Sequence, residues 1–356
     1  FMRRMKQKER IAIIGAGITG LLTACMIVRK GFSVTVFDKQ PFPPVNASSI
    51  AGGMLAPCSE IESMPFAYME AGLAGIEIWK EILGDNSAVY FKQKGSLIIA
   101  HRDDHHMMER FEQHLDSAGG KWECVDGARI KILEPDLGRF DQGIYLPREA
   151  HILPLLALEA LSGYLVEKGM KILQKDVKPE DLLEDFDKVI DCRGYDAETD
   201  DSELRGVKGE IILIRADNFK LRRPVRLMHP RYPLYIIPRP DNTFAVGATA
   251  IESAGDDGLV CIRSALELLS AVYSLHENLA HARVLDMSSG IRPAYPDNLP
   301  RIKISENGRY VRCNGLFRHG YLLSPVMGRC VARYLETGEQ DEFFPLFSGR
   351  FNHALR

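Results

Sequence analysis

Blocks of apolar and polar residues divide the start of the chain into a strand, a helix and a second strand. Residues 11–14 (IAII) form an uninterrupted apolar run with the length of a buried strand. Apolar residues at helical spacing follow over positions 21–27, and Gly31 marks the end of this segment. Residues 33–37 (SVTVF) predict a second strand, with Asp38 at its end. This order predicts a strand-helix-strand unit of a parallel sheet.

The rest of the chain predicts further helices and strands. Helical spacing predicts helices at residues 65–84, 154–168 and 258–273, a polar helix at 101–119, and a terminal helix after residue 320. Residues 188–191 predict a buried strand that closes on Gly194. Two antiparallel hairpins are expected, one joining residues 88–91 to 96–100, the other joining residues 233–240 to 243–250 across an Asp-Asn turn. Residues 287–302 and the stretch before the terminal helix are expected to be loops of small residues.

Composition narrows the class of protein. A chain of 356 residues that is 46% hydrophobic is long enough for about two domains with buried cores. The formal net charge of -3 gives no reason to expect nucleic acid or an anionic membrane surface as a partner. No uninterrupted apolar run reaches the roughly 18 residues of a membrane span, and the basic first ten residues lack the apolar stretch of a secretory signal. We therefore expect a cytoplasmic protein.

The cysteines and one histidine pair do not suggest a metal site. The seven cysteines are scattered and never have C-x-x-C spacing, so we expect reduced core thiols and neither a disulfide framework nor a zinc site. No ordered base lies near Cys58 in the sequence, which favours a structural role for this thiol over a nucleophilic one. His105 and His106 are adjacent and would point in different directions on a helix, so we expect both to be solvated.

The turn between the first predicted strand and helix contains three glycines in G-x-G-x-x-G spacing. Gly15 allows a tight turn, Gly17 lets the backbone approach a pyrophosphate, and Gly20 lets the helix pack close to the strand. The first amides of the helix would face the phosphates. Asp38 is placed to accept hydrogen bonds from a ribose hydroxyl. A plain glycine turn is the alternative, but the presence of both strands, the helix and the acid favours nucleotide binding.

Residues 45–60 (VNASSIAGGMLAPCSE) are dominated by small residues. Small residues are what a backbone needs to lie flat against a bulky planar ligand. A flexible surface loop is the alternative, for which Met54, Leu55 and Pro57 are rather apolar.

Five blocks together carry a resemblance to a known family. They are the N-terminal glycine loop, SSIAGGMLAP at 48–57, YIIPR…FAVGAT at 235–249, SGIRPAYPDNLPRI at 289–302 and NGLFRHGYLLSPVMG at 314–328. In these blocks the chain resembles the D-amino acid oxidase (DAO) superfamily of FAD-dependent amine oxidases, and within it the glycine oxidases of thiamine biosynthesis. The resemblance implies an α/β fold in which two domains are interleaved. One is a Rossmann-like FAD-binding domain (residues 1–85, 147–205 and 286–356), and the other is a substrate-binding domain with a mixed or antiparallel β-sheet (residues 86–146 and 206–285).

The resemblance also implies how FAD is held. Binding would be non-covalent, because the loop in which some relatives attach flavin through a cysteine contains none here. The glycine loop would hold the pyrophosphate, and Asp38, where the family usually has Glu, would hold the adenosine ribose. Residues 53–55 would lie along the isoalloxazine, and residues 318–322 would cover its pyrimidine side. The full set implied to bind FAD is Gly15, Gly17, Ile18, Thr19, Gly20, Asp38, Lys39, Ser48, Ser49, Gly53, Met54, Leu55, Val177, Gly194, His319, Gly320, Tyr321 and Leu322.

Three residues are candidates for the substrate site. Arg292 is the natural anchor for an α-carboxylate, because a guanidinium meets a carboxylate as a planar, bidentate fork. Tyr235 resembles the substrate-binding tyrosine of the family, although a packed strand tyrosine is the alternative. Arg318 would be a second substrate contact or a partner for the flavin carbonyls. Arg226 and His229 line the same site or form a simple turn.

The activity implied is oxidation of glycine or another small amino acid by hydride transfer from Cα to flavin N5. The imine would be hydrolysed to an oxo acid and ammonia, or be captured by a thiazole synthase, and dioxygen would be reduced to hydrogen peroxide. No metal is expected, and a homo-oligomer is possible. The alternatives are a sarcosine, D-amino acid or D-proline oxidase, a dehydrogenase that reduces a quinone, and a non-catalytic flavin-binding subunit. An NAD dehydrogenase predicts a second nicotinamide half-domain, where this chain has a strand-rich insertion.

Overall fold

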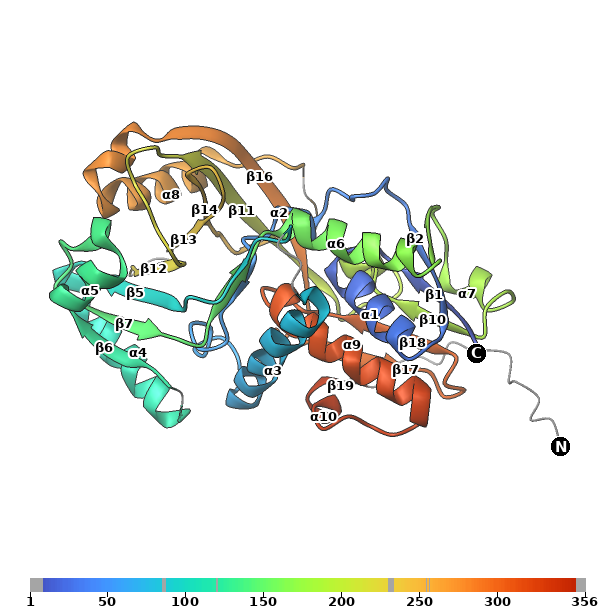
Figure 1. The fold of residues 1–356 in the computed structure, drawn as a ribbon. Helices are drawn as coiled ribbons and strands as arrows, with labels where there is room; N and C mark the ends of the chain where they lie inside the picture. Colours follow the sequence, from blue (N-terminus) through green and yellow to red (C-terminus); the bar gives the residue numbers. More distant parts are fainter. Residues whose placement is uncertain are drawn as a thin grey trace. The chain divides into compact units, whose positions relative to one another are not determined.

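The computed structural model describes residues 9–84, 88–119, 121–229, 234–253, 255 and 257–349. The chain folds into two compact units, each assembled from separate segments (Figure 1). The first unit comprises residues 1–49, 157–205 and 292–356, and the second comprises residues 50–156 and 206–291. The basic residues 1–8 and Pro233, the first residue predicted for the second hairpin, lie outside the described residues. Within the described part of the chain, no helix is both long and apolar enough to cross a membrane.

The boundary between the units differs from the predicted one at residues 50–85, 147–156 and 286–291. The helix α3 (Phe66–Leu83) was expected in the first domain, but it belongs to the second unit. Its Met69 shares a hydrophobic cluster with Ile98 and Phe111, which lie in a strand and a helix of the second unit. The apolar face of α3 therefore determines which unit it joins.

The first unit is built on a seven-stranded sheet with the order β19-β17-β18-β10-β1-β2-β9. The five strands from β18 to β9 are parallel, as predicted for the first βαβ unit, whereas β17 is antiparallel to β18. The strands are β1 (Arg10–Ile14), β2 (Ser33–Asp38), β9 (Lys171–Gln174), β10 (Lys188–Asp191), β17 (Arg301–Ile304), β18 (Tyr310–Asn314) and β19 (Ser348–Gly349). Because β1 and β10 are adjacent and parallel, the turns that follow them meet at one edge of the sheet.

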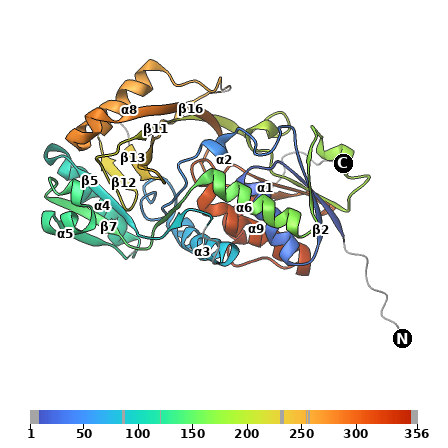
Figure 2. The ribbon, with the colours of Figure 1, turned by 45° about the horizontal axis from the view of Figure 1, so that its top comes forward.

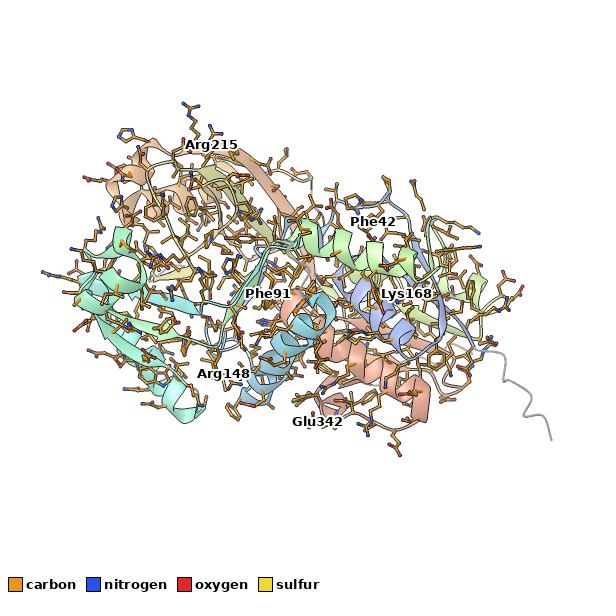
Figure 3. The ribbon with its side chains drawn as sticks, in the orientation of Figure 1. Phe42, Phe91, Arg148, Lys168, Arg215 and Glu342 are labelled. Atoms are coloured by element: carbon orange, nitrogen blue, oxygen red, sulfur yellow. The ribbon has the colours of Figure 1, made fainter. Side chains whose placement is uncertain are left out.

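Helices α1 (Ile18–Arg29) and α9 (Gly320–Thr337) lie side by side in the first unit, as both views show (Figures 1 and 2). The Sγ of Cys25 in α1 lies 3.7 Å from the carbonyl oxygen of Leu161 in α6 (Pro154–Glu167). Near the C-terminal end, Arg329 pairs with Asp341 and with Glu342, which is labelled in Figure 3. The remaining helical segments are α2 (Ala47–Ile50), α7 (Pro179–Leu182), η3 (Gly194–Ala197) and α10 (Phe344–Phe347).

The second unit contains a nine-stranded sheet with the order β15-β11-β14-β13-β12-β5-β7-β6, and β16 pairs with β11 outside this path. The strands are β5 (Ser96–Ala100), β6 (Glu123–Asp126), β7 (Gln142–Leu146), β11 (Arg205–Arg215), β12 (Val225–Met228), β13 (Leu234–Pro238), β14 (Thr243–Gly247), β15 (Ile251–Glu252) and β16 (Arg283–Ala294). A separate three-stranded sheet has the order β3-β8-β4, with β3 (Met54–Leu55), β4 (Phe91–Lys92) and β8 (Ala150–Ile152). The predicted hairpin β13–β14 is confirmed: Asp241 and Asn242 both have positive φ in its turn.

Hydrophobic clusters cover the nine-stranded sheet on both faces. In β5, Leu97 and Ile99 join a cluster with residues of α5 (Gly127–Leu133) and α8 (Ile262–Leu275), whereas Ile98 and Ala100 join a cluster with α4 (His105–Ser117). Successive side chains of a strand point to opposite faces, so the sheet is packed between helices. The short turns η1 (Arg102–Asp104), η2 (Pro135–Leu137) and η4 (Glu277–His281) complete this unit.

Three local predictions are wrong. Residues 88–91 and 96–100 do not pair with each other: β4 joins β8, and the fully buried β5 pairs with β7 and β12. The small-residue loop expected at 287–302 contains much of β16 and the start of β17, and β18 precedes the terminal helix. The pattern missed β17 and β18 because each buries a charged residue, Lys303 and Arg312, which ion pairs make tolerable.

Two predictions about single side chains also need correction. None of the cysteines is in a disulfide, but Cys124 and Cys261 are exposed, since one lies in the short strand β6 and the other caps α8. His106 is exposed as expected, whereas His105 is half-buried and its Nε2 lies 3.5 Å from Oδ1 of Asp141. Cys58 is buried, and burial raises the pKa of its thiol to about 12, which fits a structural role.

Candidate active site

The glycine loop of the first unit is a close-fitting backbone turn at the ends of β1 and β10. Gly15 has a φ of 102°, and a Cβ there would lie 2.4 Å from the carbonyl oxygen of Cys192, in the turn after β10. A Cβ on Gly20 would lie 1.9 Å from the carbonyl oxygen of Gly15. Neither position can accept a side chain without moving backbone, so the glycines are required by the turn itself. The turn that follows β10 therefore lies directly against the glycine loop.

The first turn of α1 carries no charge that would repel an anionic ligand. It contains no acidic side chain, and Gly17 at its N-cap contributes only backbone. The Ile18 amide donates to Oγ of Ser48 over 3.0 Å, and the Ser48 carbonyl accepts from the Tyr321 hydroxyl over 2.9 Å. Thr19 Oγ1 lies 3.0 Å from Ser324 Oγ in α9. The fold therefore brings together the glycine loop, Ser48 and the start of α9, three of the segments predicted to bind FAD.

Asp38 lies at the end of β2, where the sequence predicted it, and its carboxylate also supports the glycine loop. Oδ2 accepts from the Ala16 amide over 2.7 Å, and Oδ1 accepts from the Gln40 amide over 2.8 Å. Lys39 is paired with Asp196 on the surface, 2.9 Å apart. Both carboxylate oxygens of Asp38 thus accept hydrogen bonds from backbone amides. A carboxylate oxygen can accept more than one hydrogen bond, and binding of a ribose hydroxyl by Asp38 stays a prediction.

Three further predicted residues of the first unit have structural partners. The Ser49 hydroxyl donates to the carbonyl of Asn46 and accepts its amide, each over 3.0 Å. Val177 is buried with residues of β1 and β2, and the carbonyl of Gly194 accepts from Asn314 over 2.8 Å. A role for these residues in FAD binding remains a prediction.

Arg292 lies near the end of β16 and not in a loop, as was expected for residues 287–302. The Pro293 carbonyl accepts from the Phe317 amide over 2.9 Å, and Ala294 forms an antiparallel bridge with Leu316. The next residue, Arg318, places its guanidinium 5.2 Å from the centre of the Phe317 ring. His319, Gly320, Tyr321 and Leu322 follow at the start of α9. Arg292 and Arg318, two predicted substrate residues, therefore lie in backbone segments that are joined by hydrogen bonds.

A buried ionic cluster supports this part of the first unit. The Lys303 ammonium, 2% exposed, donates to both oxygens of Asp201 over 3.0 and 2.8 Å, and the Tyr295 hydroxyl donates to the same carboxylate over 2.9 Å. Burial opposes ionisation of Asp201, but these donors hold the pKa of its carboxyl below the ordinary value. Because Tyr295 is only three residues from Arg292, the cluster anchors the loop that follows β16.

The same cluster extends to Asp191 at the end of β10. The Tyr310 hydroxyl donates to Asp191 Oδ2 over 2.6 Å, and the Arg193 and Arg312 side chains pair with the same carboxylate. Burial by itself favours the protonated form of Asp191, but the two guanidiniums favour the carboxylate more strongly. The pKa of Asp191 is therefore below its ordinary value. The strand end next to the glycine turn is therefore held by paired charges.

In the second unit, Tyr235 and Arg226 face each other across neighbouring strands and contact the segment after β3. The Tyr235 hydroxyl donates to Oε1 of Glu60 over 2.8 Å. Arg226 donates to the carbonyl of Ser59 over 2.7 Å and to Oε2 of Glu62 over 2.8 Å. Burial disfavours the charged guanidinium, yet the nearby Tyr235, Glu60 and Glu62 raise the pKa of Arg226 overall. Arg226 thus lies beside Tyr235, and His229 is half-buried just beyond β12. That the two residues line the substrate site stays a prediction.

Glu149, just before β8, holds the same segment from another side. Its Oε1 accepts from the Cys58 amide over 2.9 Å and from the Ser59 amide over 2.6 Å, and its Oε2 accepts from the Ser59 hydroxyl over 2.7 Å. The side chain is 0% exposed, and this burial raises the pKa of Glu149 to about 7 despite these donors. Figure 3 labels Arg148, which precedes it.

Gly53 begins the small-residue strand β3 with a φ of 80°. A Cβ there would lie 1.9 Å from the Ile152 carbonyl of β8, so the backbones are in close contact. Met54 pairs with His151 and packs against the cluster that contains Tyr235. The fold thus joins β3, predicted to bind flavin, to the Tyr235 face of the second unit.

Five buried or paired residues of these surroundings carry little signal in local sequence patterns: Glu60, Glu62, Glu149, His151 and Lys303. Glu60 is the last residue of the small-residue segment 45–60, and Glu62 lies just beyond it, whereas Glu149 and His151 lie in the stretch GIYLPREAHILP at 143–154, for which no element was predicted. A carboxylate and a histidine within such an apolar stretch were the available signal, since polar residues are seldom buried without a role. Lys303 directly follows the loop expected at 287–302, and no strand was predicted there.

The fold of the first unit and its glycine turn indicate the class of protein to which the chain belongs. A parallel βαβ unit, a turn of closely packed glycines at the strand ends, a helix whose first turn has no acidic side chain and an aspartate at the end of β2 define a dinucleotide-binding enzyme domain. The glycine turn at the start of α1 fits FAD, because the pyrophosphate binds backbone amides with no Cβ in the way. The chain belongs to the DAO family of FAD-dependent oxidoreductases, which matches residues 10–334. Its cofactor is FAD, and it is an FAD-dependent amine oxidoreductase of the D-amino acid oxidase type.

Individual relatives support this assignment. The chain is 41% identical over 329 residues to the "Putative thiamine biosynthesis oxidoreductase ThiO" of Rhizobium etli, covering 92% of this chain and 97% of that protein. It is 24% identical to the "Bifunctional protein ThiO/ThiG" of Trichormus variabilis, with 95% of this chain matching about half of that longer protein, 54%. The fold is similar to that of glycine oxidase from Geobacillus kaustophilus, with a TM-score of 0.80, 21% identity, and coverage of 97% and 100% of the two chains.

Proposed function

We propose that this enzyme oxidises glycine or another small amino acid to the imine, yields an oxo acid such as glyoxylate, ammonia and hydrogen peroxide, and supplies thiazole synthesis for thiamine. The observation that carries the proposal is the 41% identity over 92% of the chain to a protein named for thiamine biosynthesis. The fused ThiO/ThiG relative supports a link to a thiazole synthase partner. When bound, FAD supplies the hydride acceptor and returns the electrons to dioxygen.

Arg292 is the proposed anchor for the substrate carboxylate. A guanidinium at this position offers two parallel N–H donors, which orient a carboxylate as well as bind it. Its backbone is held next to the Arg318 segment by the Pro293–Phe317 hydrogen bond, so the anchor has a defined position. Arg292 then fixes one end of the amino acid and leaves the Cα–H bond to be oriented by the rest of the site.

Tyr235 is the proposed contact for the substrate amine. Its hydroxyl has a single proton, which it donates to Glu60 over 2.8 Å. The phenol oxygen therefore acts toward a further ligand as an acceptor, and an amine N–H is a suitable donor. The carboxylates of Glu60 and Glu62 next to one guanidinium make this part of the second unit favour an amine over a second carboxylate.

An oxygen-consumption assay on the holoenzyme tests the proposal, with peroxide measured in parallel. Glycine, sarcosine, D-alanine and D-proline are compared, and we expect glycine or the smallest amino acid to have the highest kcat/KM. Arg292→Ala is expected to raise KM about 100-fold, since losing a charged bidentate contact costs about 3 kcal/mol. FAD content should stay unchanged.

Arg263→Ala is the matched control, because the Arg263 side chain is 85% exposed on α8. It should leave KM as in the unmodified enzyme. If the flavin is bound but no amino acid reduces it in the absence of oxygen, the amino acid oxidase proposal is wrong, and a non-catalytic flavin-binding subunit becomes the better description.

A further inference from the structure

Exposed apolar side chains gather on one part of the second unit. Of the fourteen large apolar side chains that are exposed among the described residues, eight lie between residues 251 and 287. Helix α8 and the first half of β16 carry most of them, and α8 lies at the edge of the second unit in both views (Figures 1 and 2). Single exposed apolar residues are ordinary, but a gathered set indicates an interaction surface.

Helix α8 is apolar on two opposite faces. One face packs into the hydrophobic core of the second unit through Leu268, Ala271, Val272 and Leu275. On the opposite face, Ile262, Leu266 and Tyr273 are 80%, 62% and 66% exposed. Leu269, between the last two, is half-buried. Successive steps of four, three and four residues keep these four side chains on one face, with the a/d spacing of a seam between two packed helices. This outer face of α8 therefore fits another helix.

The start of β16 widens the apolar surface. The turn η4 joins the end of α8 to β16, and the Ser289 hydroxyl donates to the carbonyl of Leu259, just before α8, over 3.1 Å. The first seven residues of β16 span about 23 Å and the helix about 21 Å, so this part of the strand runs beside α8 from its end to its start. Val284, Leu285 and Met287 in this part of β16 are exposed.

The spacing on the outer face of α8 fits a second copy of the same chain. The steps of four, three and four residues read the same in both directions. An antiparallel copy related by a two-fold axis therefore places Ile262 against Tyr273 of the second copy, and Leu266 against its Leu269. Every apolar residue of the seam then meets another apolar residue.

The charges at the two ends of α8 are also complementary in this arrangement. Arg263, in the first turn, is 85% exposed and donates to Glu267 over 3.2 Å. Glu277, just beyond the end of α8, is exposed. An antiparallel copy brings Arg263 toward the C-terminal end of the other helix and its Glu277, where a cation is favourable. A guanidinium has five N–H donors, so Arg263 can bind a second carboxylate.

We propose that the outer face of α8 and the start of β16 form a two-fold interface between two copies of this enzyme, in which the two α8 helices pack antiparallel. The proposal rests on exposure, spacing and charge, and not on which amino acid the enzyme oxidises. Each contact occurs twice in such a dimer, so a small face on each copy is sufficient for a specific interface.

The mass of the holoenzyme in solution tests the proposal. It is measured by light scattering during gel filtration from about 1 to about 50 µM, because dissociation depends on protomer concentration. We expect the mass of two chains. Leu266→Glu should weaken the dimer about 100-fold, with FAD content unchanged, because a charge replaces an apolar contact at two symmetry-related places. Val166→Glu, at a residue of α6 that is 61% exposed, is the matched control and should stay dimeric.

A pair of substitutions tests the antiparallel arrangement. Tyr273→Glu should weaken the dimer, because its carboxylate would lie against Ile262 of the second copy. Adding Ile262→Lys places an ammonium opposite that carboxylate and should restore the dimer. The two positions are about 16 Å apart along one helix, so the new charges cannot pair within one chain.

Three results would overturn the proposal. One is a monomeric unmodified enzyme at all concentrations, including the case in which it binds a thiazole synthase and Leu266→Glu abolishes that binding, since the face would then serve that partner. Another is a Leu266→Glu variant that stays as dimeric as Val166→Glu. The third is a double variant no more dimeric than Tyr273→Glu alone, which would exclude the antiparallel pairing.

Discussion

Replacing Glu149 by glutamine should change how the stability of the enzyme depends on pH. The carboxylate is 0% exposed, and its pKa is raised to about 7 from the 4.5 of an unburied glutamate, chiefly by burial. A raised pKa of an acid means that the folded state holds the proton more tightly. The protonated Glu149 therefore contributes fully to the free energy of unfolding below about pH 4.5, and this contribution is lost as pH rises through 7. Between pH 5 and pH 8 the loss amounts to about 2 to 3 kcal/mol.

Glutamine is a close match in shape at this site. Its carbonyl oxygen can accept from the Cys58 and Ser59 amides, as Oε1 of Glu149 does, and its amide can donate to the Ser59 hydroxyl. The variant therefore loses the titration but keeps the contacts. We expect it to be more stable than the unmodified enzyme at pH 8 by about 2 kcal/mol and little different at pH 5.

Thermal unfolding of both holoenzymes at pH 5, 6, 7 and 8 with saturating FAD measures this difference. A change of 2 to 3 kcal/mol corresponds to about 5 to 10 °C for a unit of this size. His151 and other groups titrate alike in both proteins, so the difference between them isolates Glu149. Glu77→Gln, an exposed carboxylate of α3 with 62% of its side chain accessible, should show no such difference. Parallel curves for Glu149→Gln and the unmodified enzyme would mean that Glu149 keeps an ordinary pKa.

Three other changes test the site. Gly20→Ala should abolish tight FAD binding, because the new Cβ would lie 1.9 Å from the Gly15 carbonyl oxygen. Gly163→Ala, in open space on α6, should bind FAD normally. Equal FAD affinities of the two variants in a titration would refute the role of the glycine turn in FAD binding. Lys303→Met should destabilise the protein by about 3 kcal/mol, because it leaves the buried Asp201 without its ammonium partner. Lys80→Met, at an exposed lysine, is the control. If both variants unfold at the same temperature, the buried ionic cluster does not stabilise the protein. Tyr235→Phe should raise KM for the amino acid about tenfold with FAD binding intact, since one hydrogen bond is lost; an unchanged KM would make Tyr235 a packing residue only.

Local patterns in the sequence determined the nucleotide-binding half of the protein. The first βαβ unit, its three glycines and Asp38 were predicted in place, because periodicity, turn chemistry and cap residues act within about 30 residues of chain. The same holds for the β13–β14 hairpin, whose Asp-Asn turn requires positive φ at both residues. Such features need no knowledge of distant segments.

Only the tertiary structure decided which distant segments meet. Lys303 and Arg312 become buried strand residues because Asp201 and Asp191 lie beside them, and no pattern within β17 or β18 shows this. Met69 places α3 in the second unit through a cluster formed with two later elements. Glu149 reaches residues about 90 positions earlier in the chain, and His151 is notable only because its nitrogens are buried without partners in the described structure. Burial and pairing depend on contacts between residues far apart in sequence, so they emerge only when the chain is folded.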